Sequence, residues 1–142
     1  MQTSARNQFA GEVVAAHAGA VNDEIVIGLP TGQQIVATVT SESARRLGLT
    51  QGRKAVAMVK ATSVIVMVDG DPAMLSTRNA IAGTVTEVRT GAVNTDVTIT
   101  AAGGVAIAAV ITNSSAARLG LAAGKPATAI FKAASVIVGV DG

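Results

Sequence analysis

Residues 40–70 read TSESARRLGLTQGRKAVAMVKATSVIVMVDG, and residues 112–142 read TNSSAARLGLAAGKPATAIFKAASVIVGVDG. The two stretches start 72 residues apart and share one order: a helix-forming segment, a turn, and two β-branched runs separated by a break. Thr40 is typical of a residue that caps a helix N-terminus, with Ser43 at the third helical position, and Gly48 is typical of a residue that ends a helix. The shared order indicates that one small structural unit occurs twice in the chain.

The repeat continues upstream of both stretches without a gap. The motif SARN returns as STRN, and the motif GAVN returns unchanged, so the matching segments are 4–7 with 76–79 and 19–22 with 91–94. Asp71-Pro72 lies at the junction, where proline discourages a continuous helix or a central strand. We therefore expect two tandem domains, residues 1–70 and residues 73–142, joined by a linker of only a few residues.

Each repeat is expected to contain five short strands and one short helix. In the first repeat the predicted strands are 9–16, 24–29, 34–39, 54–60 and 64–68. Turn-forming residues separate the first three, and the break at 60–63 predicts a bulge or a corner. The fold class is therefore all-β. Five strands with a helix before the fourth fit a small closed barrel of the OB type, and a two-sheet sandwich is the alternative.

The composition excludes several kinds of partner. The 142 residues contain no cysteine and a single histidine, His17, so we expect no site for a free metal cation. Two phenylalanines and a net charge of +2 supply neither the stacking platforms nor the basic groove of a barrel that binds single-stranded nucleic acid. The N-terminus lacks the apolar core of a secretory signal, and no apolar run approaches the roughly 18 residues of a membrane span. A soluble, cytoplasmic protein without a membrane partner is expected.

Residues for catalysis are not evident in the repeat. Carboxylates do not recur as a pair, since Glu42 becomes Ser114 in the second repeat. No serine keeps a histidine partner, because His17 becomes Arg89, and no phosphate-binding GxxxxGK[ST] loop occurs. We therefore expect a protein that is not an enzyme and that needs no cofactor.

The polar residues that both repeats retain are mainly hydroxyls, arginine and lysine. An arginine fork, a lysine charge and hydroxyl donors form the mixture that binds an oxyanion. The start of the helix at Thr40 and the corner at Lys60 add backbone N–H groups. Taken singly, Thr40 and Ser43 are more often helix caps, and Lys60 is more often a solvated charge. The repeat nevertheless retains them while exposed positions such as Glu12 and Gln33 change.

These motifs together resemble a known family. SARN followed by Gly11, then GAVN, VTxxS at 39–43, LGL at 47–49 and KAxxV at 60–64 resembles the Mop domain of the molbindins. Two tandem copies resemble the di-domain molbindin of molybdenum-using bacteria, and also the C-terminal half of the molybdate-dependent transcriptional regulator without its DNA-binding half. The resemblance implies two tandem OB-like five-stranded β-barrel domains, each with one short helix, in a trimer of two-domain chains.

The resemblance also implies a function and its sites. The function is binding, storage and homeostasis of the molybdate oxyanion, or of tungstate, with no nucleic acid as partner. The oxyanion would lie at interfaces between subunits and domains, bound by Ser4, Arg6, Thr40, Ser43, Lys60 and Ala61, and again by Ser76, Arg78, Thr112, Ser115, Lys132 and Ala133. A second type of oxyanion site near a three-fold axis would involve Val21, Asn22, Val93 and Asn94. Which N-terminal pair faces which helix stays open.

Two other functions are alternatives to molybdate storage. One is a molybdate-responsive sensor or adaptor that acts through a protein partner, and the other is a nucleic-acid-binding OB protein. The thin core expected from about 70 residues of mostly small side chains adds a further prediction, that the chain is an obligate homo-oligomer. The one change in the leading motif, Ala5 to Thr77, keeps its serine and its arginine.

Overall fold

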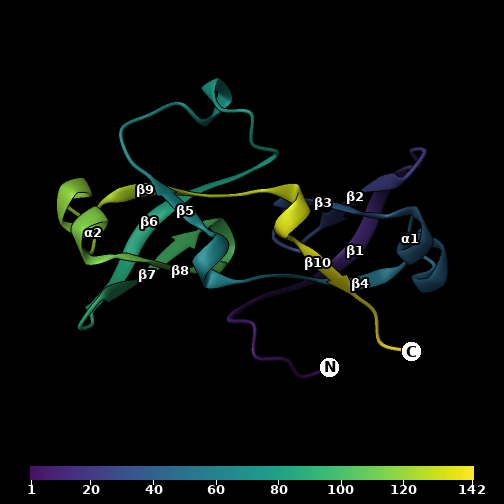
Figure 1. The fold of residues 1–142 in the computed structure, drawn as a ribbon, viewed down its shortest axis with the longest axis horizontal. Coiled ribbons are helices and arrows are strands. Elements are labelled where there is room, and N and C mark those ends of the chain that lie inside the picture. Colours follow the sequence, from purple (N-terminus) through teal and green to yellow (C-terminus); the bar gives the residue numbers. More distant parts are fainter. The chain divides into compact units, whose positions relative to one another are not determined.

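The computed structural model describes residues 1–142 (Figure 1). The chain divides into two units: unit 1 comprises Met1–Val59 with Lys132–Gly142, and unit 2 comprises Lys60–Phe131. Each unit contains one five-stranded sheet and one short α-helix, which confirms the predicted all-β class. No helix combines the length and the apolar character needed to cross a membrane.

Unit 1 contains a sheet with the strand order β10-β4-β1-β2-β3, in which all neighbours are antiparallel. Its elements are β1 (Asn7–His17), β2 (Asn22–Gly28), β3 (Gln34–Thr40), α1 (Ser41–Leu47), β4 (Lys54–Val59), the 3-10 turn η4 (Ala133–Ser135) and β10 (Ile137–Gly139). Besides pairing with β4, β10 contacts β3, so the sheet curls round until its two edge strands meet. This closure is that of the predicted OB-like barrel and not of a two-sheet sandwich.

Unit 2 repeats this arrangement with the strand order β5-β9-β6-β7-β8, and β5 contacts β8 in the same way. Its elements are η1 (Ala61–Ser63), β5 (Ile65–Met67), η2 (Pro72–Met74), β6 (Asn79–Thr90), β7 (Asn94–Ala101), η3 (Ala102–Gly104), β8 (Ala106–Thr112), α2 (Asn113–Leu119) and β9 (Pro126–Phe131). The break predicted at 60–63 is a corner, formed by η1 between the extended residues Lys60 and Val64.

The last strand of each sequence repeat belongs to the sheet of the other repeat. β5 pairs with β9 through Ile65 and Ile130, and β10 pairs with β4 through Ile137 and Met58. The predicted division at 1–70 and 73–142 therefore follows the repeat in sequence, whereas the units in space each take one strand from the other repeat. Because of the corner at η1, the chain does not form a hairpin between β4 and β5. β4 pairs with β10 instead.

Equivalent positions form the cores of the two units. The fully buried aliphatic side chains of the central strands are Val13, Ile25, Ile27, Ile35 and Ala37 in unit 1 and Val85, Val97, Ile99, Ile107 and Ala109 in unit 2. They alternate along their strands, as side chains that share one face of a sheet must. The repeat in sequence is thus a repeat of one packing pattern.

The first strand of each repeat bends so that it can pair with two different strands. In β1 the register shifts between Val13 and Ala15, and β6 has the same bulge between Val85 and Glu87. Just before the bulge of β1, a Cβ atom on Gly11 would lie 2.3 Å from the carbonyl oxygen of Gly28, so only glycine allows this approach. The bend lets β1 pair with β4 at its start and with β2 along its second half.

The helices begin and end where the sequence predicts. Thr40 Oγ1 accepts a hydrogen bond from the N–H group of Ser43 at 3.1 Å, and Gly48 ends α1 in the left-handed region with φ of 63°. Thr112 and Gly120 cap α2 with the same geometry. α1 and α2 therefore start at fixed points, directly after β3 and β8.

Candidate functional site

The hydroxyl groups predicted for an oxyanion site are oriented by each other. In addition to capping the helix, the Thr40 hydroxyl donates to Ser43 Oγ at 2.8 Å, which leaves the Ser43 proton to donate to a ligand. The second repeat has the same pair, Thr112 and Ser115, at 2.9 Å. In both repeats the threonine is exposed and the serine is half-buried. The threonine–serine hydrogen bond is thus alike in the two repeats, and in the second repeat Ser115 Oγ also accepts a hydrogen bond from Arg118 at 3.5 Å.

The residues predicted for the second type of oxyanion site lie beside these hydroxyls. Asn22 is the ladder partner of Thr40, and the Val21 carbonyl accepts a hydrogen bond from the N–H group of Ser41 at 2.9 Å. In the second repeat Asn94 pairs with Thr112, and the Val93 carbonyl accepts from the N–H group of Asn113 at 3.1 Å. The two predicted types of site therefore share one location in each repeat, which we call the hairpin–helix junction (residues 19–24 with 40–43, and residues 91–96 with 112–115).

The predicted cations lie at a different place. Asn7 is the ladder partner of Val59, so Arg6 just before β1 and Lys60 just after β4 are both at this end of the two strands. Asn79 and Phe131 form the corresponding pair between Arg78 and Lys132. All four cationic side chains are exposed. Each SARN-type motif thus shares one strand end with the lysine of its own repeat, away from the threonine and serine that the resemblance places in the same site.

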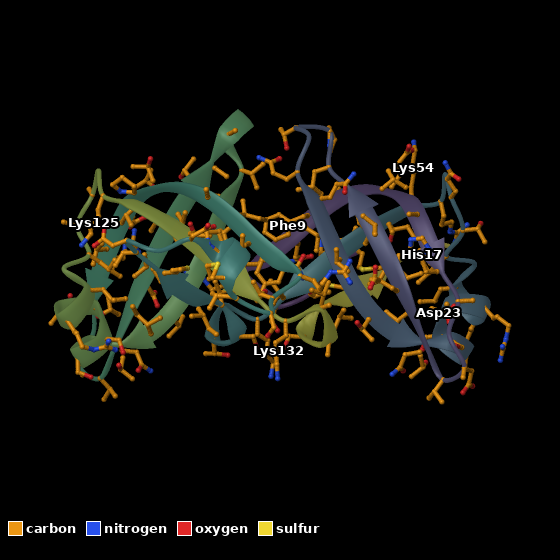
Figure 2. The ribbon with its side chains drawn as sticks, turned by 90° about the horizontal axis from the view of Figure 1, so that it is seen from above. Phe9, His17, Asp23, Lys54, Lys125 and Lys132 are labelled. Atoms are coloured by element: carbon orange, nitrogen blue, oxygen red, sulfur yellow. The ribbon has the colours of Figure 1, made fainter.

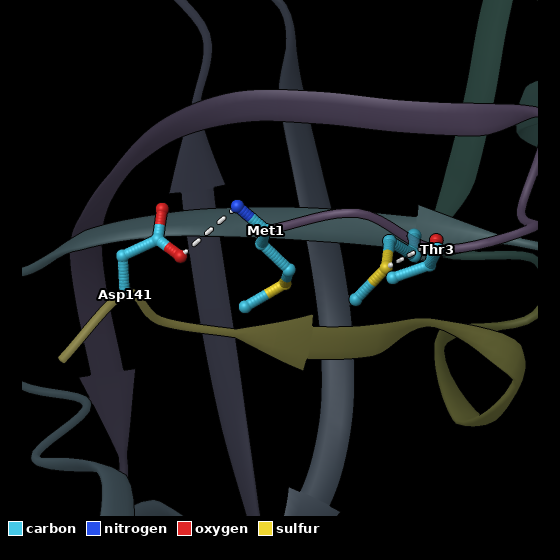
Figure 3. A network of polar contacts seen from close by, with 4 residues as sticks. Met1, Thr3 and Asp141 are labelled. Carbon is cyan, nitrogen blue, oxygen red and sulfur yellow. Dashed lines mark hydrogen bonds and ion pairs between the residues drawn. The ribbon is translucent and has the colours of Figure 1, made fainter.

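The N-terminal motif of unit 1 is held in place by the residues around it. The Met1 ammonium group lies 3.4 Å from Asp141 Oδ1, and the Thr3 hydroxyl donates to Met58 Sδ at 3.5 Å (Figure 3). Gln8 Nε2 also donates to the Ala5 carbonyl at 2.8 Å. Ser4 and Arg6 therefore start from a fixed segment and not from a frayed terminus.

The change from Ala5 to Thr77 has a structural role. The Thr77 hydroxyl lies 3.0 Å from the carbonyl oxygen of Asn79 and 3.3 Å from that of Phe131, and its single proton is shared between these two acceptors. It also accepts a hydrogen bond from the N–H group of Asn79 at 3.2 Å. The second repeat thus fixes its motif to β9 with a hydroxyl group, where the first uses contacts with Met58 and Asp141.

The cations and the hydroxyls lie at opposite ends of the first strand of each repeat. In unit 1 the Asn7 end of β1 adjoins Val59, whereas the His17 end pairs with Glu24, close to the Asn22–Thr40 pair. β1 has 11 residues, and at about 3.3 Å per residue the two ends are roughly 30 Å apart along the strand. Figure 2 likewise places Lys132 far from Asp23 and α1, which belong to the same unit. Neither unit alone surrounds an ion with both groups.

One set of contacts at the junction was not predicted. Asp23 Oδ1 accepts hydrogen bonds from the Ser41 hydroxyl at 2.5 Å and from the Gly19 N–H group at 3.2 Å. In the second repeat a buried Thr95 hydroxyl donates to Asn113 Oδ1 at 2.6 Å, and Asn113 Nδ2 donates to the Gly91 carbonyl at 3.0 Å. The signal was in the sequence: two positions 18 residues apart change together, from Asp and Ser to Thr and Asn.

Metal-binding clusters of three or more His, Cys, Asp or Glu side chains do not occur in the structure. The candidate site is therefore described by its donors alone: hydroxyl and backbone N–H groups at one end of each unit, and arginine and lysine at the other.

The chain is similar along its whole length to known proteins. The TOBE domain family matches residues 3–66 and 75–138. Sequence identity is 43% over 141 residues to the "Molybdenum transport protein ModE" of Herbaspirillum seropedicae, covering 99% of this chain and 52% of that protein. It is 41% over 138 residues to the "Molybdenum-pterin-binding protein MopA" of Rhodobacter capsulatus, covering 97% and 52%. The chain therefore spans about half the length of these curated relatives.

A solved structure matches both units at once. It is described as the cytoplasmic molybdate-binding protein ModG in a form with molybdate bound, and the two folds agree with a TM-score of 0.94. Sequence identity is 46%, and the match covers 99% of this chain and 100% of that one. The likeness therefore covers both repeats and not one domain alone.

Proposed function

Because the chain belongs to the TOBE-domain family as a tandem pair of Mop domains of the molbindin type, we propose that it binds molybdate and stores or buffers it in the cytoplasm. The observation that carries this proposal is the match, over the full length of both chains, to a protein described with molybdate bound. The proposal is of a binding protein and not of an enzyme, since the relatives' names describe binding, transport and regulation. It includes neither a nucleic-acid nor a membrane partner.

The separation of hydroxyls and cations supports a site between chains. A buried dianion needs charge-assisted hydrogen bonds as well as neutral donors. A unit that carries the two groups at opposite ends can complete such a site when its cationic end meets the hydroxyl end of a neighbouring chain. Contacts between unlike ends are head-to-tail, and they close into a ring when the rotation allows it. We take this ring to be the trimer that the resemblance implies.

Each proposed site combines two half-sites. The cationic half-sites are Ser4, Arg6, Lys60 and Ala61 in the first repeat and Ser76, Arg78, Lys132 and Ala133 in the second. The hydroxyl half-sites are Thr40 with Ser43, and Thr112 with Ser115. Val21 with Asn22, and Val93 with Asn94, form the second type of site. Arginine supplies two directed donors, lysine a point charge, and the hydroxyls neutral donors whose positions the helix caps fix.

Molybdate should raise the melting temperature strongly, whereas sulfate should raise it much less. A ligand that binds only the folded state stabilises it by about 2.7 kcal/mol at a hundredfold excess over its Kd. Both ions are tetrahedral dianions, so only size can separate them: donors placed for the larger ion are left unpaired around sulfate, at roughly 1–3 kcal/mol each. Tungstate, nearly equal to molybdate in size, should act like molybdate.

The measurement is a thermal melt with each anion at matched ionic strength, together with a calorimetric titration. A selective shift with molybdate and tungstate supports the proposal. Equal shifts with sulfate and molybdate would indicate a generic anion site, and the storage function would then have no physical basis.

A further inference from the structure

The two hairpin–helix junctions differ in charge. In the first repeat, residues 21–24 and 40–43 include three carboxylates: Asp23, Glu24 and Glu42. In the second repeat, the equivalent residues 93–96 and 112–115 include one, Asp96. The main chain is alike in both junctions. The N–H group of Ser41 donates to the Val21 carbonyl, and the N–H group of Asn113 donates to the Val93 carbonyl. The same backbone arrangement thus carries two more negative charges in the first repeat.

The side-chain link between hairpin and helix is present in both repeats, although the second repeat has Thr95 in place of the charged Asp23. Asp23 holds Ser41 and Gly19 with its carboxylate, at 2.5 Å and 3.2 Å. Asn113 makes the equivalent link without a charge, because its amide accepts from Thr95 at 2.6 Å and donates to the Gly91 carbonyl at 3.0 Å. Either pair of side chains therefore satisfies the structural role of linking hairpin to helix, and the two pairs differ in charge.

Resting on the proposed function above, we propose that the two repeats form non-equivalent oxyanion sites. The sites that use the second junction (Val93, Asn94, Thr112 and Ser115) bind the dianion more tightly than those that use the first (Val21, Asn22, Thr40 and Ser43). Asp23 and Glu42 are the residues that weaken the first class. Asp23 contacts Ser41 and Gly19 of the junction, and Glu42 lies between Ser41 and Ser43 in the chain, so both act on a bound anion through their electric field and not as ligands.

The expected size of the difference follows from simple electrostatics. A carboxylate within about one Debye length of a bound dianion repels it, and exposure to water limits the effect to roughly a threefold loss of affinity per charge. Two such charges give a difference of about tenfold between the classes. Arg45, which becomes Ala117, lies in the last turn of α1 and offsets part of it. High salt should shrink the difference, because the responsible groups are exposed or only half-buried.

The test is a calorimetric titration with sodium molybdate at low and at high ionic strength, on the wild-type chain and on two exchange variants. Asp23→Thr with Ser41→Asn and Glu42→Ser gives the first repeat the neutral junction of the second. Thr95→Asp with Asn113→Ser and Ser114→Glu does the reverse. Glu12→Thr is the matched control, since it also removes an exposed carboxylate in favour of its repeat counterpart, Thr84, but lies away from the junction.

The wild-type chain should show two classes of site that differ about tenfold. The first variant should convert the weak class to the tight class, the second should do the opposite, and the control should change neither. Circular dichroism and a melt without ligand verify that each variant is folded. Should a variant not fold, the single change Asp23→Asn keeps the hydrogen-bonding shape and should still tighten the weak class.

Other results would overturn the inference. A single affinity for all sites in the wild-type chain would overturn it while leaving molybdate binding intact. Two classes that the exchanges leave unchanged would overturn the assignment to Asp23 and Glu42. The absence of any molybdate binding would overturn the proposed function, and this inference with it.

Discussion

Replacing Val138 by alanine should loosen the first unit, although Val138 belongs to the second repeat. Val138 lies in β10, pairs with Ala57 of β4 and is 7% exposed. Val66 is its counterpart in β5; it pairs with Ala129 of β9 and is also 7% exposed. The two valines therefore form a matched pair, equal in burial and in local sequence, that differs only in the unit it completes.

The magnitude follows from the burial. Valine to alanine removes two methyl groups, each worth about 0.8 kcal/mol when buried. The cavity left in a short strand adds to this, so about 1.5–2.5 kcal/mol of stability should be lost. Where amide exchange proceeds through opening of the unit, this loss accelerates exchange roughly ten- to sixtyfold in its protected strands.

Hydrogen exchange followed by mass spectrometry distinguishes the units, because β4 and β9 fall in different peptides. Val138→Ala should accelerate exchange in residues 54–59 and leave residues 126–131 close to wild type. Val66→Ala should give the reverse pattern. Faster exchange in β9 on mutation of Val138, or equal acceleration in both strands with either variant, would refute the exchange of strands.

Three further predictions concern the site, the assembly and the bend of β1. Replacing Arg6 and Arg78 by lysine should weaken molybdate binding about tenfold or more without unfolding the chain, because the fork is lost and the charge is kept; unchanged affinity in calorimetry would remove these arginines from the site. Sedimentation at micromolar concentration should show one species near 42 kDa, about three times the 14.0 kDa of the chain, and a folded monomer with full binding would contradict a site between chains. Gly11→Ala should cost roughly 2 kcal/mol or more in chemical denaturation, since its Cβ would lie 2.3 Å from the Gly28 carbonyl oxygen, and a neutral result would mean that the strands separate easily.

Most of the secondary structure could be predicted because its signals are local. Thr40 caps α1 and Gly48 ends it through contacts within a few residues. The strands were recognisable from β-branched runs between turn formers, and their bounds differ from the predicted ones by one or two residues at most ends. The molbindin resemblance is also confirmed, since its motifs are short and occur at fixed spacings in both repeats.

The partner of the last strand could not be predicted from the same signals. Residues 63–66 and 135–138 have the identical sequence SVIV, so each segment fits either sheet equally well. Periodicity shows that a segment is a strand, but not which of two equivalent strands it pairs with. The choice depends on the path of the chain after the corner at η1, which is a property of the folded structure.

The candidate site was predictable as a set of residues but not as an arrangement. Because both repeats retain them, Arg6 and Thr40 were predicted as site residues. Asn7 is retained as well, but it is buried where β1 begins to pair with β4, so its role is structural. Nothing in the spacing indicated that cations and hydroxyls lie at opposite ends of β1. The Asp23 link, by contrast, was visible as a paired change and would have been found by comparing the repeats position by position.

The strand exchange also sets the order in which the two units can be finished during synthesis. Unit 2 is one continuous segment, Lys60–Phe131, so every strand of its sheet is present once residue 131 has left the ribosome. Unit 1 begins earlier but lacks its fifth strand until residues 137–139 have been made, nearly 80 residues after the end of β4. The edge of β4 stays open to other chains for that whole interval. Of the two units, the one whose strands are translated first is thus the one completed last, which reverses the usual N-to-C order of folding on the ribosome.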